Sequence, residues 1–273
     1  MKAGAKYSRA AYPGVRRGKD DSMKKERTYR LTLQTLNEYQ ESAFQNASDL
    51  ITEAETLLER KHFARTYYLA CAALEESGKA FLAFLSKGRN LNDPGVQTKT
   101  RAGFEDHRSK ILSSLGCLLQ STKKTKEDIN RCIEIAFGIE VGRERAMYVD
   151  LTDKGAVILP RNNITETNAV DCIRLAKAAL QATIEYASTK VPTEYSPFEN
   201  KLFCIRSEKL TKIMTSEDFS KYLLEVAAND PSGLDLKRAL VTYHDKFFSK
   251  GKLYSDKLKA KPGSHDEYET AKT

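Results

Sequence analysis

The stretch of sequence that decides the fold is residues 62–86, which read HFARTYYLACAALEESGKAFLAFLS. Phe63, Tyr67, Leu74, Phe81 and Leu85 recur at helical spacing and mark one apolar face. Alanines and other apolar residues occupy most of the remaining sides, and a helix that is apolar nearly all round is typical of a buried position. We therefore predict a central helix here, with alanines that let neighbouring backbones approach closely.

The segments on either side of this helix predict further helices that pack against it. Residues 30–59 have apolar side chains every three or four positions, which is the pattern of a long amphipathic helix. After a loop at residues 87–96, further helices are expected at residues 103–120, 124–147 and 165–189. Two β-prone runs flank a turn at residues 153–155 and favour a small hairpin. The expected fold class is all-α, an antiparallel helical bundle with a small hairpin insertion.

The chain divides by composition into four parts. Residues 1–29 combine Gly, Pro, Ser and charged residues without periodicity, so we expect a disordered basic N-terminal arm. The helical bundle is expected to occupy residues 30–190. A linker with two prolines opens residues 191–250, where helices near residues 205–214, 216–228 and 233–249 predict a C-terminal helical extension. Residues 251–273 are expected to form a loose tail.

The net charge of +8 is concentrated near the N-terminus. Residues 1–30 contain ten Lys or Arg residues and three acidic residues, which accounts for +7 of that total. Because the rest of the chain is nearly neutral, attraction for RNA would come from the arm or from local patches, not from a uniformly basic surface. A solvated arm is the favoured interpretation of these charges, and a nucleic-acid adaptor that binds through the arm is the alternative.

The composition argues against several classes of protein. The longest apolar run, residues 67–74, is far shorter than the roughly 20 residues of a membrane span, and the N-terminus lacks the apolar block of a secretory signal. We therefore expect a cytoplasmic protein that does not bind membranes. Five single cysteines and four scattered histidines predict reduced thiols and no metal site. No glycine-rich phosphate loop follows a strand, so we expect no cofactor.

Charged residues interrupt the apolar segment at its centre. Arg65, Glu75, Glu76 and Lys79 project into one sector about 100° wide, so they are expected to form a polar cluster on one side of the helix. If the cluster is buried, desolvation costs several kcal/mol per ion, and the cluster persists only where its charges are paired. The favoured interpretation is a salt-bridge network inside the bundle or at an interface. The alternative is a network that supports a catalytic site.

Three segments, in this order, resemble the AbiV family of abortive-infection proteins, which belongs to the HEPN superfamily. They are LEESGKA at residues 74–80 with the alanine-rich run before it, FEDHRSK at residues 104–110 and RAMYVD at residues 145–150. The resemblance covers residues 32–190. It implies a helical bundle that forms a homodimer and blocks phage multiplication through translation or RNA.

The resemblance also implies a candidate catalytic pair. Many HEPN proteins are metal-independent endoribonucleases with an Arg, four to six further residues and then a His, and five residues separate Arg101 from His107. A His can act as general base or acid on a ribose 2′-hydroxyl, and an Arg can stabilise charge on the adjacent phosphate. Lys110 follows His107 by three residues and is expected to share its helical face, so it completes the candidate site.

Two features of the candidate pair argue against it. Ala102 stands where the nuclease families commonly have a polar residue, and Arg101 and His107 would lie about 120° apart on a continuous helix. An Arg101 that precedes the helix carrying His107 would remove this second objection. Arg238 and His244 have the same spacing outside the resembling region. The structural alternative for His107 is a hydrogen-bonded core or interface residue.

Arg143, Arg145 and Tyr148 are candidate contacts with RNA or a protein partner. The two arginines would form a local basic patch, and Tyr148 would either stack on a base or pack against the bundle. Two functions remain open. The first is an antiphage effector that cleaves RNA or arrests translation when a phage-encoded activator protein triggers it. The second is a non-catalytic HEPN dimer that acts as a protein–protein interaction module, so the sequence leaves open whether the protein is an enzyme.

Overall fold

The computed structural model describes residues 29–120, 126–152, 155–229 and 235–259. The N-terminal arm expected at residues 1–29 lies outside these ranges except for Tyr29, and most of the tail expected at residues 251–273 also lies outside them.

The described chain is almost entirely helical, which confirms the expected fold class. The bundle contains α1 (Leu33–Glu59), α2 (Phe63–Ser86), α3 (Pro94–Glu105), α4 (His107–Gln120), α5 (Lys126–Met147), α6 (Pro160–Asn163) and α7 (Glu166–Thr189). The small hairpin pairs β1 (Asp150–Leu151) with β2 (Val157–Ile158) in antiparallel register, with Asp150 opposite Ile158. Within the described ranges, no helix combines the length and the apolar character that crossing a membrane requires.

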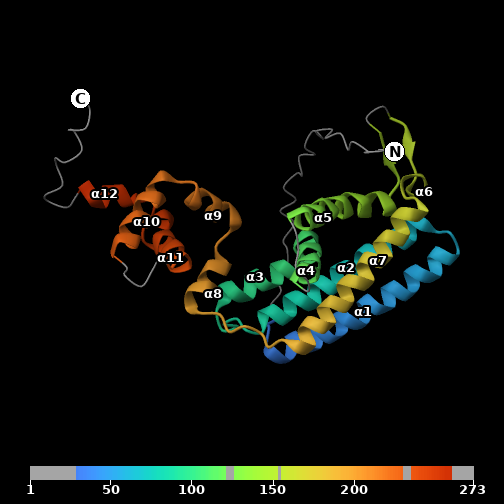
Figure 1. Cartoon of the computed structure of the whole chain (residues 1–273), viewed down its shortest axis with the longest axis horizontal. Helices are drawn as coiled ribbons and strands as arrows, with labels where there is room; N and C mark the ends of the chain where they lie inside the picture. Colours follow the sequence, from blue (N-terminus) through green and yellow to red (C-terminus); the bar gives the residue numbers. More distant parts are fainter. Residues whose placement is uncertain (1–28, 121–125, 153–154, 230–234, 260–273) are drawn as a thin grey trace. The chain divides into compact units, whose positions relative to one another are not determined.

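Helix α2 lies at the centre of the bundle, as its sequence predicts, and packs against α1, α4, α5 and α7 (Figure 1). Ala70, Cys71, Ala73 and Leu74 in its middle are completely buried. Side chains from three other helices enclose them, namely Ala47 and Ile51 of α1, Ile111 and Leu115 of α4, and Ile173 and Ala176 of α7. The small side chains of α2 allow these helices to approach on several sides at once.

Helices α1 and α2 form an antiparallel pair that is joined by a tight turn. Lys61 adopts a φ of 61°, in the left-handed region that L-residues rarely enter. The amide of Lys61 donates to the carbonyl of Leu58, and the amide of His62 donates to that of Leu57, both at 2.9 Å. These two bonds satisfy carbonyls at the end of α1, which is the usual role of a left-handed residue after a helix.

Helix α7 closes the bundle and runs in the same direction as α2. Cys71 and Cys172 face each other with their sulfur atoms 3.7 Å apart. Further along both helices, the ring of Tyr186 makes edge contacts with Phe81 and Phe84, at centroid distances of 5.3 and 5.6 Å. The intervening helices α3 to α6 return the chain to the start of α2. Helix α7 therefore begins there and runs parallel to α2.

The structure corrects the prediction for the segment between α2 and α4. A single helix at residues 103–120 was expected after a loop extending to Val96, but α3 already begins at Pro94. The Asp93 carboxylate accepts hydrogen bonds from the amides of Gly95 and Val96, and a proline at the first helical position has no amide to leave unpaired. Asp106 then interrupts the helix with an extended backbone, and its carboxylate accepts from the amide of Ser109.

The C-terminal extension contains α8 (Pro197–Cys204), α9 (Ser207–Met214), α10 (Glu217–Asn229), α11 (Leu236–Lys246), the 3₁₀ turn η1 (Phe248–Lys250) and α12 (Tyr254–Lys259). Helix α8 begins within the expected linker, because Ser196 and Glu199 form a reciprocal cap around Pro197. Arg89 of the bundle lies between the rings of Tyr195 and Phe203, 4.0 and 3.7 Å from their centroids.

Helix α12 corrects the expectation of a loose segment from residue 251 onward. Its first residue, Tyr254, is 2% exposed and packs with Phe219, Tyr222, Tyr243 and Phe247. The Asp218 carboxylate accepts from the amides of Tyr254 and Ser255, at 2.7 and 3.0 Å. A distant aspartate therefore caps the start of α12, and no local sequence pattern reveals such a cap.

Candidate functional site

The candidate site is built around Glu75, a carboxylate in the buried middle of α2. Its side chain is 7% exposed. Three basic side chains surround it, namely His107 and Lys110 from α4 and Arg143 from α5. We call these four residues the Glu75 cluster. A buried carboxylate is tolerated only where cations and hydrogen bonds replace the water that it has lost, and this arrangement supplies both.

One carboxylate oxygen of Glu75 receives two of the three basic groups. Oε2 lies 2.7 Å from Nδ1 of His107 and 2.8 Å from Nζ of Lys110. Lys110 is nearly fully buried, with 5% of its side chain exposed, whereas 51% of the His107 side chain is exposed. Lys110 therefore holds the carboxylate from inside the bundle, and His107 extends from the carboxylate to the surface.

Arg143 approaches the other oxygen of Glu75. Its Nε lies 3.1 Å from Oε1, which is close enough for an ion pair, but neither atom makes a hydrogen bond within the described residues. The guanidinium group also lies over the ring of Tyr68, 5.5 Å from its centroid. Arg143 thus adds positive charge beside the carboxylate, while its position is set in part by an aromatic ring.

The contact with Glu75 fixes the orientation and the tautomer of His107. A carboxylate accepts hydrogen bonds and cannot donate them, so a hydrogen bond in the 2.7 Å contact requires the proton on Nδ1, which also lies 3.4 Å from Nζ of Lys110. In neutral His107 the other ring nitrogen, Nε2, is then unprotonated and able to accept a proton. Because half of the side chain is exposed, this arrangement presents an oriented base at the surface of the bundle.

Gly78 allows α4 to come close enough to α2 for the cluster to form. A Cβ atom at this position would lie 1.8 Å from the carbonyl oxygen of Lys110, far inside any permitted contact. Since Gly78 is one turn from Glu75 on the same helix, the close approach brings Lys110 and His107 to the carboxylate. The glycine in the segment LEESGKA is therefore a packing requirement of the site.

The structure separates the residues that were expected to form one polar cluster. Glu76 and Lys79 form their own ion pair at 2.5 Å, with 15% and 22% of their side chains exposed. Arg65 is exposed and makes no contact with Glu75. It shares the angular sector of Glu75 but lies ten residues away, which is about 15 Å along a helix axis.

Arg101 and His107 lie on different helices. Arg101 is inside α3 and precedes α4, the helix that begins at His107, so the objection from a continuous helix does not apply. Its guanidinium contacts the side-chain oxygen of Gln97 at 3.3 Å. Gln97 in turn exchanges hydrogen bonds with the backbone of Leu31, near the start of α1. The structure therefore places Arg101 beside Gln97, and the basic groups that contact Glu75 are His107, Lys110 and Arg143.

The other candidate residues are distributed over the surface. Arg145 and Tyr148 are exposed near the hairpin, and 61% of Tyr148 is accessible, so this tyrosine does not pack against the bundle. Arg238 and His244 lie on α11, where Nδ1 of His244 contacts Asp245 at 2.9 Å. The exposure of His107 likewise contradicts its interpretation as a core histidine.

The contact between Arg143 and Glu75 was not predicted from the sequence. Arg143 had been grouped with Arg145 as a surface patch, because both are basic and lie near the end of one helix. A buried glutamate does require cations, and that requirement is visible in the sequence. Which cations pair with Glu75 depends on how α5 crosses α2. At that crossing Gly142 lies so close to Tyr67 that a Cβ atom on the glycine would be 2.5 Å from the tyrosine hydroxyl.

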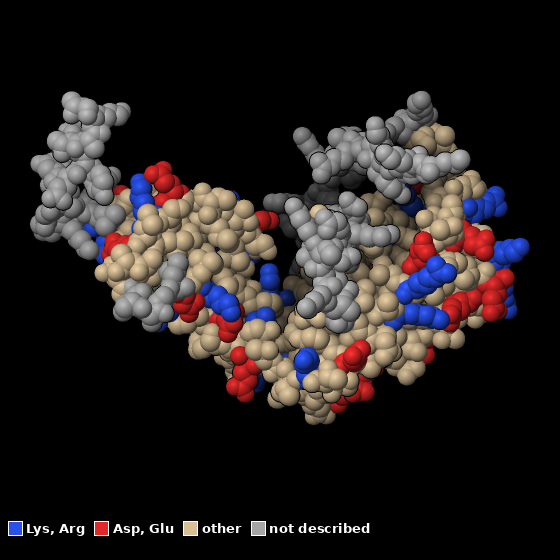
Figure 2. Space-filling model, viewed as in Figure 1, with Lys and Arg blue, Asp and Glu red and all other residues tan. Residues whose placement is uncertain are grey.

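Acidic and basic side chains lie next to each other on the face of the bundle shown in Figure 2. Lys177 of α7 pairs with Glu55 of α1, and Arg174 lies 3.5 Å from Asp171. Within the described ranges, His, Cys, Asp and Glu side chains do not gather in groups of three or more that suit a metal ion. The Glu75 cluster differs from these exposed ion pairs, because its carboxylate is buried and has three basic partners.

The fold defines the class of protein as an all-α helical bundle. The model of the AbiV family of HEPN proteins matches residues 35–181, which is more than half of the 273-residue chain. The chain therefore belongs to the AbiV family, which is a family of abortive-infection proteins. Nothing matches it among curated proteins or among solved structures.

Proposed function

We propose that the chain is an antiphage abortive-infection effector that cleaves RNA without a metal, with His107 as its acid–base group. The observation that carries this proposal is the 2.7 Å contact between Nδ1 of half-exposed His107 and the buried carboxylate of Glu75. A carboxylate that orients a histidine is a recurring device of acid–base catalysis, because it fixes the tautomer and stabilises the imidazolium that forms.

In the proposed reaction, Nε2 of His107 takes the proton from a ribose 2′-hydroxyl. The 2′-oxygen then attacks the adjacent phosphorus and the bond to the 5′-oxygen breaks. The departing 5′-oxygen takes up a proton from solvent water, and the His107 imidazolium returns its proton to the solvent. The products are a strand with a 2′,3′-cyclic phosphate and a strand with a free 5′-hydroxyl. Lys110 is a positioning residue in this scheme, because it is buried and acts on the Glu75 carboxylate.

Positive charge for the phosphate comes from Arg143 in this proposal, since 23% of its side chain is exposed beside the histidine and the carboxylate. Arg101 was the expected partner, but its contact with Gln97 assigns it to the junction of α3 with the start of α1. An Arg143→Gln variant should therefore lose more cleavage activity than an Arg101→Gln variant.

The test is to incubate the purified chain with total cellular RNA in EDTA, with and without extract from phage-infected cells. Cleavage should produce 2′,3′-cyclic phosphate ends and should fall by about 100-fold or more in a His107→Ala variant. His62→Ala is the matched control, because His62 is exposed at the start of α2 and lies outside the cluster. If no cleavage occurs under either condition, the ribonuclease proposal is wrong.

A second candidate function is a non-catalytic homodimer that acts as a protein–protein interaction module for a phage-encoded or host protein. Exposed apolar side chains around the hairpin favour it, with Val149 at 61%, Leu151 at 63% and Val157 at 64% exposure. Contiguous apolar surface of this kind often marks an interaction site. If Leu151→Asp abolishes phage protection while His107→Ala leaves it intact, this second function replaces the first.

A further inference from the structure

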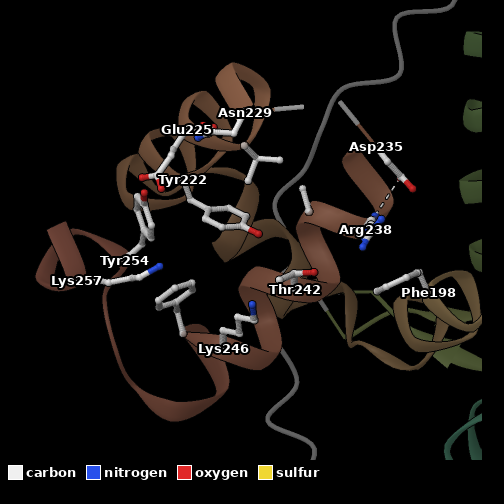
Figure 3. Close-up of a pocket in the computed structure, with 13 residues that line it drawn as sticks. Phe198, Tyr222, Glu225, Asn229, Asp235, Arg238, Thr242, Lys246, Tyr254 and Lys257 are labelled. Carbon is white, nitrogen blue, oxygen red and sulfur yellow. Dashed lines mark hydrogen bonds between the residues drawn. The ribbon is translucent and has the colours of Figure 1, made fainter. Parts of the chain in front are cut away.

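The C-terminal extension contains a pocket that the proposed RNA-cleaving site does not use. Helices α10, α11 and α12 line it together with Phe198 of α8 (Figure 3), and its volume is about 560 Å³. Pockets of roughly 300 to 1,000 Å³ accommodate small molecules and cofactors. We call this cavity the C-terminal pocket.

One face of α11 supplies polar groups to the C-terminal pocket. Arg238, Thr242 and Lys246 follow one another at intervals of four residues and all line the cavity (Figure 3). Four-residue spacing places side chains on one helical face. Arg238 and Lys246 are exposed and Thr242 is half-buried, so the guanidinium, the hydroxyl and the ammonium of this stripe are accessible to a ligand in the cavity.

The charge balance of the pocket favours an anion. Lys257 of α12 joins Arg238 and Lys246, so three cations line the cavity against the carboxylates of Glu225 and Asp235. The Asp235 carboxylate accepts a hydrogen bond from the amide of Arg238 at 3.1 Å and caps the start of α11. Positive charge therefore exceeds the negative charge that is available to a ligand.

Aromatic rings form the remaining walls of the pocket. Tyr222, Phe247 and Tyr254 line it from three elements, and Phe198 lies under the Arg238 guanidinium with 5.5 Å between group and centroid. Tyr254 is 2% exposed, and its buried hydroxyl has no hydrogen-bond partner within the described residues. Buried hydroxyls normally find a partner, so this group offers a donor to a bound molecule.

We infer that the C-terminal pocket binds a nucleoside phosphate. Aromatic walls suit a planar base, and the cations that α11 and α12 contribute to the lining suit phosphate oxygens. The inference is independent of the Glu75 cluster, because none of the residues that line the pocket belongs to that cluster.

The test is calorimetric titration of the full chain with ATP, GTP, CTP and UTP, and separately with tripolyphosphate. At least one nucleotide should bind with a Kd below about 1 mM, and Arg238→Gln or Lys246→Gln should weaken it by about tenfold or more. Lys212→Gln is the matched control, because Lys212 is an exposed lysine of α9 that does not line the pocket. Circular dichroism melting of each variant confirms that the fold is retained.

Three results would overturn the inference. The first is the absence of binding by all four nucleotides at concentrations of about 1 mM. The second is binding that the Arg238 and Lys246 variants leave unchanged, which would place the nucleotide elsewhere on the chain. The third is tripolyphosphate binding that is as tight as that of the best nucleotide, since the aromatic walls would then contribute nothing.

Discussion

Gly78 lies against the carbonyl of Lys110 so closely that a Cβ atom on the glycine would be 1.8 Å from that oxygen. This backbone contact joins α2 to α4 at the level of the Glu75 cluster. The candidate site can form only if residue 78 has no Cβ atom, because a Cβ atom would push α4 away from α2. Neither helix can be shifted locally to make room, because Leu74 and Ile111 are fully enclosed on both sides of the contact.

Replacing Gly78 with Ala should destabilise the bundle by about 3 kcal/mol or more, since the added methyl group meets backbone and not a flexible side chain. Urea denaturation followed by circular dichroism measures this change. The control is Gly116→Ala in α4, where no atom lies within 4 Å of the new Cβ. That variant should be stabilised by about 0.5 to 1 kcal/mol through helix propensity, and equal losses in both variants would contradict the proposed contact.

Replacing Glu75 with Gln should cost about 3 to 5 kcal/mol of stability, because it leaves the buried ammonium of Lys110 without a counter-charge. Glu76→Gln is the matched control. Its partner Lys79 is 22% exposed, so the loss should stay near 1 kcal/mol. A Glu75→Gln, Lys110→Met double variant should recover part of the lost stability. If its loss equals the sum of the losses of the two single variants, the two groups do not interact.

Lys61→Gly should stabilise the protein by about 1 kcal/mol. The lysine adopts φ of 61°, which is strained for a residue with a Cβ atom and unstrained for glycine. Arg60→Gly provides the contrast, because Arg60 has φ of −85° and gains nothing from a glycine. A shift of the melting temperature upward for the first variant and downward for the second is the expected result, and the reverse order would refute the strain argument.

The stability of the C-terminal extension should fall in alkali. Burial and the hydrogen bond to Asp218 raise the pKa of Tyr243 to about 12. A raised pKa means that the protonated phenol is favoured in the folded state. Its contribution is complete below the unfolded tyrosine value of about 10 and is lost as the pH rises through 12.

A Tyr243→Phe variant tests whether Tyr243 causes this loss of stability at high pH. The variant should lose about 1.5 to 3 kcal/mol at pH 8, through loss of a hydrogen bond to a charged group, and should show less further loss up to pH 11 than the unaltered chain. Tyr148→Phe removes an exposed hydroxyl and should leave the pH profile unchanged. If the Tyr243→Phe variant loses as much stability between pH 8 and pH 11 as the unaltered chain, another group is responsible for the loss.

The central position of α2 was predictable from its sequence because burial on every side requires apolar residues on every side. The hairpin was predictable because its β-prone runs flank a turn residue, and Gly155 does adopt a positive φ of 77°. Both features depend on short-range patterns that a single chain segment displays by itself.

The Glu75 cluster was only partly predictable, for two physical reasons. A helical projection records the angle of a side chain and ignores its height along the axis, so it grouped distant Arg65 with Glu75. The partners of Glu75 come from α4 and α5, 32 and 68 residues further along the chain. Their positions follow from helix crossings, at which Gly78 and Gly142 leave room for close contacts that an added Cβ atom would block.

The prediction of a loop up to Val96 was wrong, because residues that usually interrupt helices begin one here. Asp93 and Pro94 are typical of a loop when taken one by one, and together they form the cap and first turn of α3. The start of α12 was missed for the opposite reason, because its cap comes from Asp218, 36 residues earlier.

The parallel arrangement of α2 and α7 has a consequence for how the chain is made. Cys71 meets Cys172 only after 101 further residues have been added, so the ribosome releases the most apolar helix of the bundle well before its last covering helix exists. At about 5 to 20 residues per second this interval lasts roughly 5 to 20 s. Until α7 has been synthesised, the face of α2 that packs against α7 in the finished bundle lacks this cover.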